Sequence, residues 1–145
     1  MGRILAYTLC MDDCLFCKII AGEIQCEKVY EDENTFAFLD IKPINPGHTL
    51  VVPKEHFENI FDAPEDTLSD MMRTVKKIAH GLQDGLKAEH INLAMNNGVH
   101  AGQVVFHAHI HVMPRYKDDG YELWHGKEYQ DGDMHSYATE IKNAL

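Results

Sequence analysis

The chain has 145 residues, of which 45% are hydrophobic and 25% are charged. These values are typical of one globular domain with its own core and exclude a fibrous or disordered protein. The formal net charge of −10 argues against a nucleic-acid-binding surface, which needs a basic stripe. No apolar run approaches the roughly 20 residues of a membrane span, so we expect neither nucleic acid nor membrane as a partner.

Four cysteines fit a reducing compartment, where a close cysteine pair indicates metal or redox chemistry before a disulfide. The N-terminal residues include a short apolar patch but no clear small-residue cleavage site of a signal peptide. We therefore expect a cytoplasmic protein.

The first half of the chain predicts one short helix and three strands. Residues 13–21 predict the helix, which Gly22 ends. Residues 28–31 and 35–40 predict two strands around an acidic turn. A loop with two prolines follows, and residues 48–53 predict the third strand.

The second half predicts a long helix and two further strands. An amphipathic helix begins at Pro64 and ends near Gly85, with apolar residues at three- and four-residue spacing. Residues 91–95 predict a fourth strand, and residues 96–102 should turn the chain back. Residues 103–114 then predict a fifth strand, antiparallel to the fourth.

This order of elements indicates an α+β domain built on a five-stranded antiparallel sheet, with one long helix and a short N-terminal helix. After residue 116 the chain is polar and interrupted by glycines. A further short helix is predicted near residues 135–144.

Three histidines stand at every second position in the predicted fifth strand: His107, His109 and His111. Side chains alternate between the two faces of a strand, so we expect all three imidazoles on one face. The intervening apolar residues should then bury the opposite face. They are Val104, Phe106, Ala108, Ile110 and Val112.

Three interpretations of this pattern are open. The histidines could be surface residues, although strict alternation opposite an apolar face argues against that. They could bind one metal ion, but three in a row span about 13 Å of strand, which separates the outer two. They could also serve covalent catalysis, because imidazole is nucleophilic and titrates near neutrality.

The preceding turn favours the catalytic interpretation. Glycines such as Gly102 let backbone N–H groups approach a phosphate, and Asn96 and Gln103 can add neutral hydrogen bonds. The same residues would also suit an ordinary hairpin turn. A further histidine, His48, begins the predicted third strand.

The run His107-Ala108-His109-Ile110-His111-Val112-Met113 resembles the motif of the histidine triad (HIT) family. Four further segments resemble bacterial-type HIT hydrolases in the same order, namely residues 14–22, 37–41, 46–54 and 96–103. The resemblance covers residues 13–116 as a HIT domain. It leaves residues 1–12 as an N-terminal extension and residues 117–145 as a C-terminal tail, which relatives place near the partner subunit.

The resemblance implies a HIT-like fold, a homodimer and a hydrolase that cleaves a purine nucleotide at its α-phosphorus. By this resemblance His109 is the nucleophile that forms a nucleotidyl-histidine intermediate, and water then releases a nucleoside monophosphate. His111 would bind phosphate oxygens and assist proton transfer. The implied substrates are diadenosine polyphosphates, nucleoside phosphoramidates and adenylylated small groups.

The resemblance also implies the substrate contacts. Asp40 and Ile41 would contact the ribose and the base. The phosphate would be surrounded by His48, Asn96, Gly102 and Gln103, together with His109 and His111. One position departs from many relatives, because Val104 stands where they carry serine or threonine, which puts a preference for phosphoramidates in question.

Cys14-x-x-Cys17 supplies half of a tetrahedral metal site, and alone it fits metal, redox or incidental roles. The resemblance completes a structural zinc site with His56 and His107. A competing assignment uses His48 in place of His56.

Two other functions remain open. A HIT fold could bind nucleotides without catalysis, although a binding module has no need of a nucleophile. A nucleotidyltransferase is the other alternative, but that branch of the family is much longer than 145 residues.

Overall fold

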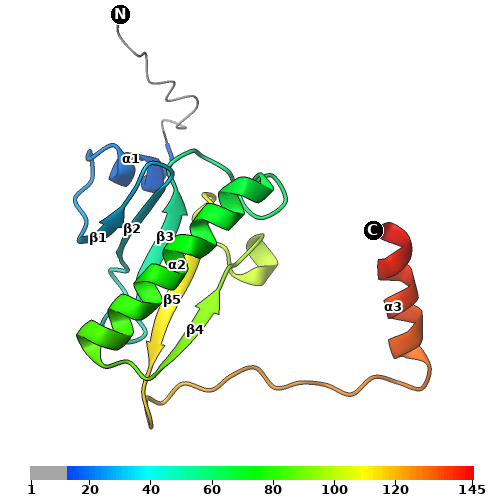
Figure 1. Cartoon of the computed structure of the whole chain (residues 1–145). Coiled ribbons are helices and arrows are strands. Elements are labelled where there is room, and N and C mark those ends of the chain that lie inside the picture. The colour runs from blue at the N-terminus through cyan, green and yellow to red at the C-terminus, as the bar shows by residue number, and fades with distance from the viewer. Residues whose placement is uncertain (1–12) are drawn as a thin grey trace, which may run out of the picture.

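The computed structural model describes residues 13–145, so the predicted extension at residues 1–12 lies outside the described part (Figure 1). The elements follow in the order α1 (Leu15–Ile20), β1 (Lys28–Glu31), β2 (Thr35–Leu39), β3 (Thr49–Pro53), α2 (Glu65–Leu86), β4 (His90–Ala94), the 3-10 turn η1 (Val99–Ala101), β5 (Ile110–Arg115) and α3 (Asp133–Ala144).

The five strands form one sheet in the order β1-β2-β3-β5-β4, and all neighbouring pairs are antiparallel. The predicted α+β fold with a five-stranded antiparallel sheet is therefore confirmed. β5 lies between β3 and β4, so its backbone is hydrogen-bonded on both sides. This central place holds the His-containing end of the strand in a fixed position.

The helix α2 covers one face of the sheet (Figure 1). Pro64 stands directly before its first turn, which carries two acidic residues, and Lys87 ends it in a left-handed conformation with φ 59°. Its apolar stripe packs on side chains of three strands, including Val51, Ile110 and Val112. This is the larger of the two apolar clusters that stabilise the fold.

The short helix α1 covers the opposite face. Phe16 and Ile19 of this helix pack against apolar side chains of β2 and β3, including Phe38 and Leu50. Leu50 is the register partner of His111. Paired residues of neighbouring strands point to the same face, so His111 lies on the α1 face of the sheet.

The prediction that the fifth strand spans residues 103–114 is wrong at its beginning, because β5 starts at Ile110. The chain bends over residues 105–107, so two of the three histidines precede the strand. The apolar residues Val104 and Phe106 are exposed rather than buried against the core. The strand begins late because the backbone before it is hydrogen-bonded to a loop and not to another strand. The Ala108 N–H donates to the carbonyl of Phe57 in that loop.

The C-terminal segment runs away from the sheet and ends in α3, which stands apart from the rest of the protein (Figure 1). None of its helical residues is buried. The helix predicted near residues 135–144 is confirmed. Among the described residues, no helix has the length and apolar character needed to cross a membrane.

Adjacent methionines of α2 allow a test of the packing. Met71 is fully buried between α2 and the sheet, whereas Met72 is half-exposed. Replacing Met71 with alanine should lower the free energy of unfolding by about 2–5 kcal/mol, because it leaves a cavity in the core. Met72→Ala should change it by about 0.5 kcal/mol or less. Urea unfolding of both variants measures the difference, and equal losses would contradict the described orientation of α2.

Candidate metal centre and histidine cluster

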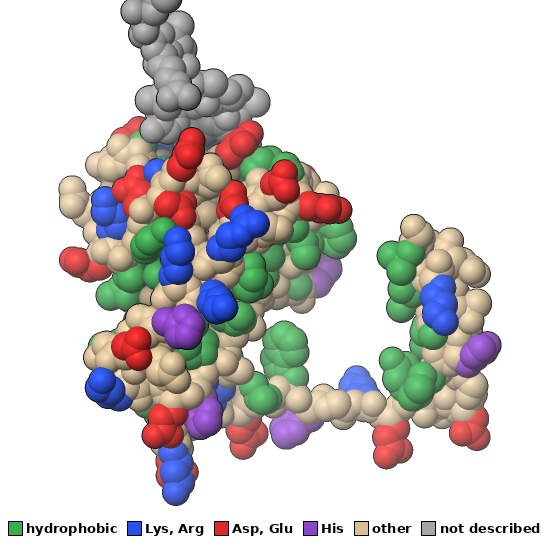
Figure 2. All heavy atoms as spheres, viewed as in Figure 1, with side chains coloured by type: hydrophobic (Ala, Val, Ile, Leu, Met, Phe, Trp, Pro, Cys, Tyr) green, Lys and Arg blue, Asp and Glu red, His purple; other side chains and the backbone are tan. Residues whose placement is uncertain are grey.

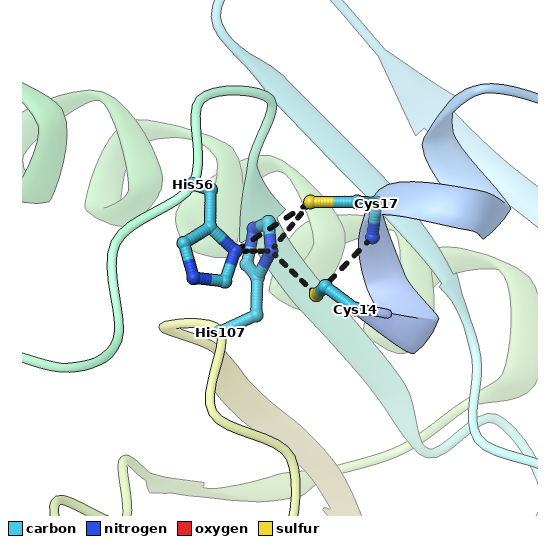
Figure 3. Close-up of side chains that lie close together, drawn as sticks. All are labelled: Cys14, Cys17, His56 and His107. Atoms are coloured by element: carbon cyan, nitrogen blue, oxygen red, sulfur yellow. Dashed lines mark hydrogen bonds between the residues drawn. The ribbon is translucent and has the colours of Figure 1, made fainter. Parts of the chain in front are cut away.

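Two cysteines and two histidines from three separate segments meet beside α1 (Figure 3). Cys14 caps the N-terminus of α1, where its Sγ accepts from the backbone N–H of Cys17 at 3.5 Å. His56 comes from the loop after β3, and His107 comes from the bend before β5. The structure thus joins the N-terminal helix to the His-containing segment.

The donor atoms of this cluster are spaced as ligands of one ion would be. The Nδ1 atom of His107 lies 3.5 Å from Cys14 Sγ, 3.6 Å from Cys17 Sγ and 3.2 Å from His56 Nδ1. Cys17 Sγ lies 3.5 Å from His56 Nδ1. Metal–sulfur bonds of about 2.3 Å and metal–nitrogen bonds of about 2.05 Å at tetrahedral angles give about 3.6 Å and about 3.3 Å for these spacings. The four side chains therefore fit a tetrahedral metal ion.

The hydrogen bond of the other ring nitrogen of His107 orients this ligand. Its Nε2 lies 2.8 Å from the carbonyl oxygen of Pro53, which can only accept, so Nε2 carries the proton. The lone pair on Nδ1 then faces the cluster, as metal binding requires. Burial away from water lowers the pKa of His107 to about 4, which favours the neutral ring.

A backbone carbonyl also fixes the ring of His109. Its Nδ1 lies 2.6 Å from the carbonyl oxygen of His107 and must carry the proton, which leaves a lone pair on Nε2. The side chain is buried and contacts the ring of Phe16. Burial lowers the pKa of His109, against the opposing effects of this hydrogen bond and of Asp40, so the neutral ring is favoured.

A separate chain of hydrogen bonds sets the tautomers of His48 and His111. The backbone N–H of Ile44 donates to His48 Nδ1 at 3.3 Å, so His48 Nε2 carries the proton and donates to His111 Nδ1 at 2.9 Å. The neutral His111 ring is then left with its proton on Nε2. Burial is the main cause that lowers the pKa of His111 to about 4.

A carboxylate oxygen of Asp40 lies 3.8 Å from His48 Nε2, so Asp40, His48 and His111 also form a group of possible metal ligands. Two observations favour a proton network over a metal site. The 2.9 Å separation of the two histidine nitrogens is shorter than the about 3.3 Å expected of two ligands on one ion. The Ile44 N–H also occupies the lone pair of His48.

The structure therefore separates the two histidines that sequence reasoning offered as alternatives. His56 lies with the two cysteines, whereas His48 lies with His111. Four of the predicted site residues thus form the metal cluster, and Asp40, His48 and His111 form a second group at the start of β5. His109 lies between the two groups, with its ring centroid 5.0 Å from that of His111.

The predicted phosphate loop is held by the side chain of Gln103. Its Oε1 accepts from the Gly98 N–H at 2.8 Å, and its Nε2 donates to the carbonyls of Glu58 at 2.6 Å and Val105 at 3.1 Å. Because these bonds occupy the buried amide, Gln103 holds the loop in shape. Gly102 adopts φ +88°, which favours glycine.

Two other predicted contacts lie near the surface. The Asn96 side chain donates to the carbonyl of Gly102 at 3.5 Å. The side chain of Ile41 is 91% exposed next to Asp40 and has no partner within the described chain that would bury it.

Sequence reasoning missed Phe16 and the carbonyl of Pro53. Phe16 occupies an unspecified position of the Cys-x-x-Cys motif, and a helix of six residues is too short for periodicity to assign its buried face. The Pro53 carbonyl acts through the backbone, which no side-chain pattern reports.

The comparisons with known proteins agree with this geometry. Residues 21–118 match the HIT domain family. The chain is 43% identical over 140 residues to Protein hit of Bacillus subtilis, covering 94% of this chain and 97% of that protein. It is 40% identical over 118 residues to Adenylylsulfatase HINT3 of Arabidopsis thaliana, covering 81% of this chain and 59% of that protein. The chain therefore belongs to the HIT family.

Solved structures support the same assignment. A HIT family protein from Bacillus subtilis is 40% identical, and the match covers 92% of this chain and 98% of that chain with a TM-score of 0.86. A histidine triad nucleotide-binding protein from Candida albicans is 34% identical, and the match covers 92% of this chain and 97% of that chain with a TM-score of 0.80. A zinc-bound histidine triad family protein from Mycobacterium smegmatis is 35% identical, and the match covers 92% of this chain and 98% of that chain with a TM-score of 0.72.

Removing one ligand tests the metal cluster. The purified protein should contain about one metal ion per chain, and Cys17→Ser should reduce this to near zero while lowering the melting temperature. Cys26→Ser is the matched control, because Cys26 lies outside the cluster. Elemental analysis of the three proteins measures the metal content. Equal content in Cys17→Ser and the wild type would show that the cluster is not the site.

The depressed pKa of His111 predicts how stability depends on pH. Between pH 6.5 and about 4 the unfolded chain binds a proton at this ring that the folded chain does not bind. The free energy of unfolding should therefore fall as pH is lowered through this range, by at most about 1.4 kcal/mol per pH unit from His111.

His111→Asn removes this proton and leaves the neighbouring His48, His109 and Asp40 in place. Its free energy of unfolding should therefore depend less steeply on pH than that of the wild type. Urea unfolding at pH 7 and pH 5 measures both slopes. Equal slopes in the two proteins would contradict the assigned environment.

Proposed function

We propose that this protein is a nucleotide hydrolase that cleaves at the α-phosphorus through a covalent bond to His109. The observation that carries the proposal is the 2.6 Å contact between His109 Nδ1 and the His107 carbonyl. This contact holds the ring as the tautomer with a lone pair on Nε2, the form needed for attack on phosphorus.

In the first step, Nε2 of His109 forms a bond to the α-phosphorus and the bond to the leaving group breaks. The leaving group departs with the electron pair and takes a proton from solvent, while the Nε2–H of His111 donates a hydrogen bond to a phosphate oxygen. In the second step, water adds to phosphorus and gives a proton back to solvent, and the phosphorus–nitrogen bond breaks with its electron pair returning to His109. The products are a nucleoside monophosphate and the free leaving group. Positioning and hydrogen bonding stabilise the transition state.

The hydrogen bond from His48 prepares His111 for this role. Because Nδ1 of His111 accepts from His48 at 2.9 Å, its single proton stands on Nε2 before the reaction. Asp40, 3.8 Å from His48 Nε2, favours a proton on that nitrogen, which keeps the donor to His111 in place. His109, oriented by a backbone carbonyl, thus supplies the nucleophile, and His111, oriented by His48, supplies a hydrogen-bond donor beside it.

The proposed substrate is a purine nucleotide such as a diadenosine polyphosphate, a nucleoside phosphoramidate or an adenylylated small group. Asp40 can accept hydrogen bonds from ribose hydroxyls, and the exposed side chain of Ile41 offers an apolar surface to the base. His48 and the loop of Asn96, Gly102 and Gln103 border the phosphate. The names adenylylsulfatase and nucleotide-binding protein among the relatives support this substrate class.

We assign zinc to the cluster of Cys14, Cys17, His56 and His107. Two thiolates and two imidazoles at tetrahedral spacing are a common zinc ligand set, and a related protein is described as zinc-bound. When bound, zinc supplies a structural cross-link, because protein side chains fill all four positions. These residues then tie α1 to the segment that carries His109.

We further propose a homodimer in which residues 117–145 contact the second copy. Along α3, Met134, Tyr137 and Ile141 are exposed on one helical face, and Trp124 before it is 97% exposed. Figure 2 shows hydrophobic side chains on the side of α3 that faces the body, with open space between them. The structural match to the Bacillus subtilis protein covers 92% of this chain, so it extends beyond residues 21–118. The boundary at residue 116 and the cytoplasmic location stay predictions.

Mass spectrometry of peptides from the reacted protein tests the reaction. The protein is mixed with an adenosine phosphoramidate, quenched in base and analysed after peptide mapping. We expect an adenylyl group on His109 in the wild type, formed more slowly in His111→Asn because that variant lacks the ring that donates to the phosphate. His109→Asn should show neither adduct nor turnover. Nucleotide binding without adduct or turnover in the wild type would instead identify a non-catalytic binding protein.

Val104 offers a test of leaving-group recognition. Its side chain is 85% exposed next to the phosphate loop, and a serine there could hydrogen-bond the leaving group. Val104→Ser should change the ratio of kcat/KM between a phosphoramidate and a dinucleoside polyphosphate by about 2- to 10-fold, the effect of one hydrogen bond, with smaller changes in KM. Val99→Ser, at another exposed valine of the loop, is the control. An unchanged ratio in Val104→Ser would exclude this contact.

A further inference from the structure

One of the two residues between the cysteine ligands contacts the proposed nucleophile directly. Phe16 lies in α1 between Cys14 and Cys17, and its side chain is only 5% exposed. Its ring centroid lies 5.1 Å from that of His109, with the two rings nearly perpendicular at 89°. The same ring contacts His107 at 5.9 Å and 66°. Phe16 thus bridges a metal ligand and the nucleophile.

A second connection runs through the backbone. The side chain of His107 belongs to the metal cluster, and its carbonyl accepts the hydrogen bond from His109. Anything that fixes His107 therefore also fixes the acceptor that sets the His109 tautomer. The backbone path and the aromatic path both begin at residues of the metal cluster and both end at the same ring.

His109 needs this support because it precedes β5 and lacks the hydrogen-bonded strand neighbours that hold His111. The hydrogen bond at Nδ1 fixes one edge of the ring but leaves the tilt of the ring plane open. Phe16 restricts this tilt by packing against the ring. Phe38 also packs against Phe16, with the two ring centroids 5.4 Å apart, and keeps it in place.

We propose that Phe16 is a positioning residue for His109, and that the metal centre acts on the nucleophile through it. A bound metal holds α1 through Cys14 and Cys17, α1 holds the ring of Phe16, and that ring holds His109 in the orientation for attack. Loss of either the metal or the Phe16 ring should leave substrate binding intact and disorder the nucleophile. The kinetic part of this inference rests on the proposed hydrolase function, whereas the ring orientation does not.

The test compares the wild-type protein loaded with metal, the wild-type protein stripped by a chelator, Phe16→Leu, and Phe36→Leu. Phe36 is the matched control because it is also 5% exposed in the same apolar cluster and has no ring contact with either histidine. The readouts are metal content, the carbon–proton NMR signals of the His109 ring, the single-turnover rate of adduct formation, and the Kd for a nucleoside monophosphate.

In metal-loaded wild type we expect one sharp set of His109 ring signals, shifted by the ring current of Phe16. In Phe16→Leu that shift should be lost and the signals should broaden or split, while the metal remains at one per chain. The single-turnover rate should fall by about 10- to 100-fold, as a misplaced reacting group predicts, with Kd changed less than about twofold. Phe36→Leu should match the wild type in all four readouts.

Stripped wild type tests the coupling without any substitution and covers the case in which Phe16→Leu fails to fold. Its His109 signals should broaden, and returning zinc should restore them. Unchanged His109 signals after stripping or in Phe16→Leu would overturn the inference, as would equal effects in Phe36→Leu. If the wild type forms no adduct, the proposed function fails, and the NMR comparison still decides whether the metal centre positions His109.

Discussion

The candidate site depends on how one residue, His107, is held. Its ring donates from Nε2 to the Pro53 carbonyl and turns Nδ1 toward Cys14 and Cys17. Its backbone carbonyl accepts from the ring of His109. Because the segment before β5 has no strand partner, these bonds replace the sheet ladder that would otherwise hold it. The side chain of His107 belongs to the metal cluster, and its main-chain carbonyl orients the proposed nucleophile.

The three triad histidines look equivalent in the sequence, and their hydrogen bonds make them different. A neutral imidazole has one proton, so the partner of one nitrogen decides the state of the other. His109 donates to a carbonyl and keeps a lone pair on Nε2, whereas His111 accepts from His48 and keeps a proton there. Burial favours the neutral form of both rings. One strand end thus presents a nucleophile beside a hydrogen-bond donor.

Much of this arrangement could be predicted from the sequence, because hydrophobic periodicity and motif spacing report local structure and shared faces. The five strands and α2 follow from such patterns. The start of β5 at Ile110 did not follow from the sequence. Apolar residues and histidines already alternate over residues 106–109, but the backbone there bonds to a loop instead of a strand. The contacts of Gln103 and Phe16 could not be predicted from the sequence either. Their contacts, with Glu58 and His109, join segments far apart in the chain, which no local pattern encodes.

Nitrogen NMR of the histidine rings in the metal-loaded wild-type protein reports which nitrogen of each ring carries the proton, and so tests whether His109 has a free lone pair on Nε2. We expect a proton on Nδ1 of His109 and on Nε2 of His111 at neutral pH. We also expect a proton on Nε2 of His107, with Nδ1 bound to metal. A proton on Nε2 of His109 would exclude this ring as the nucleophile, because that nitrogen would then have no lone pair for attack on phosphorus.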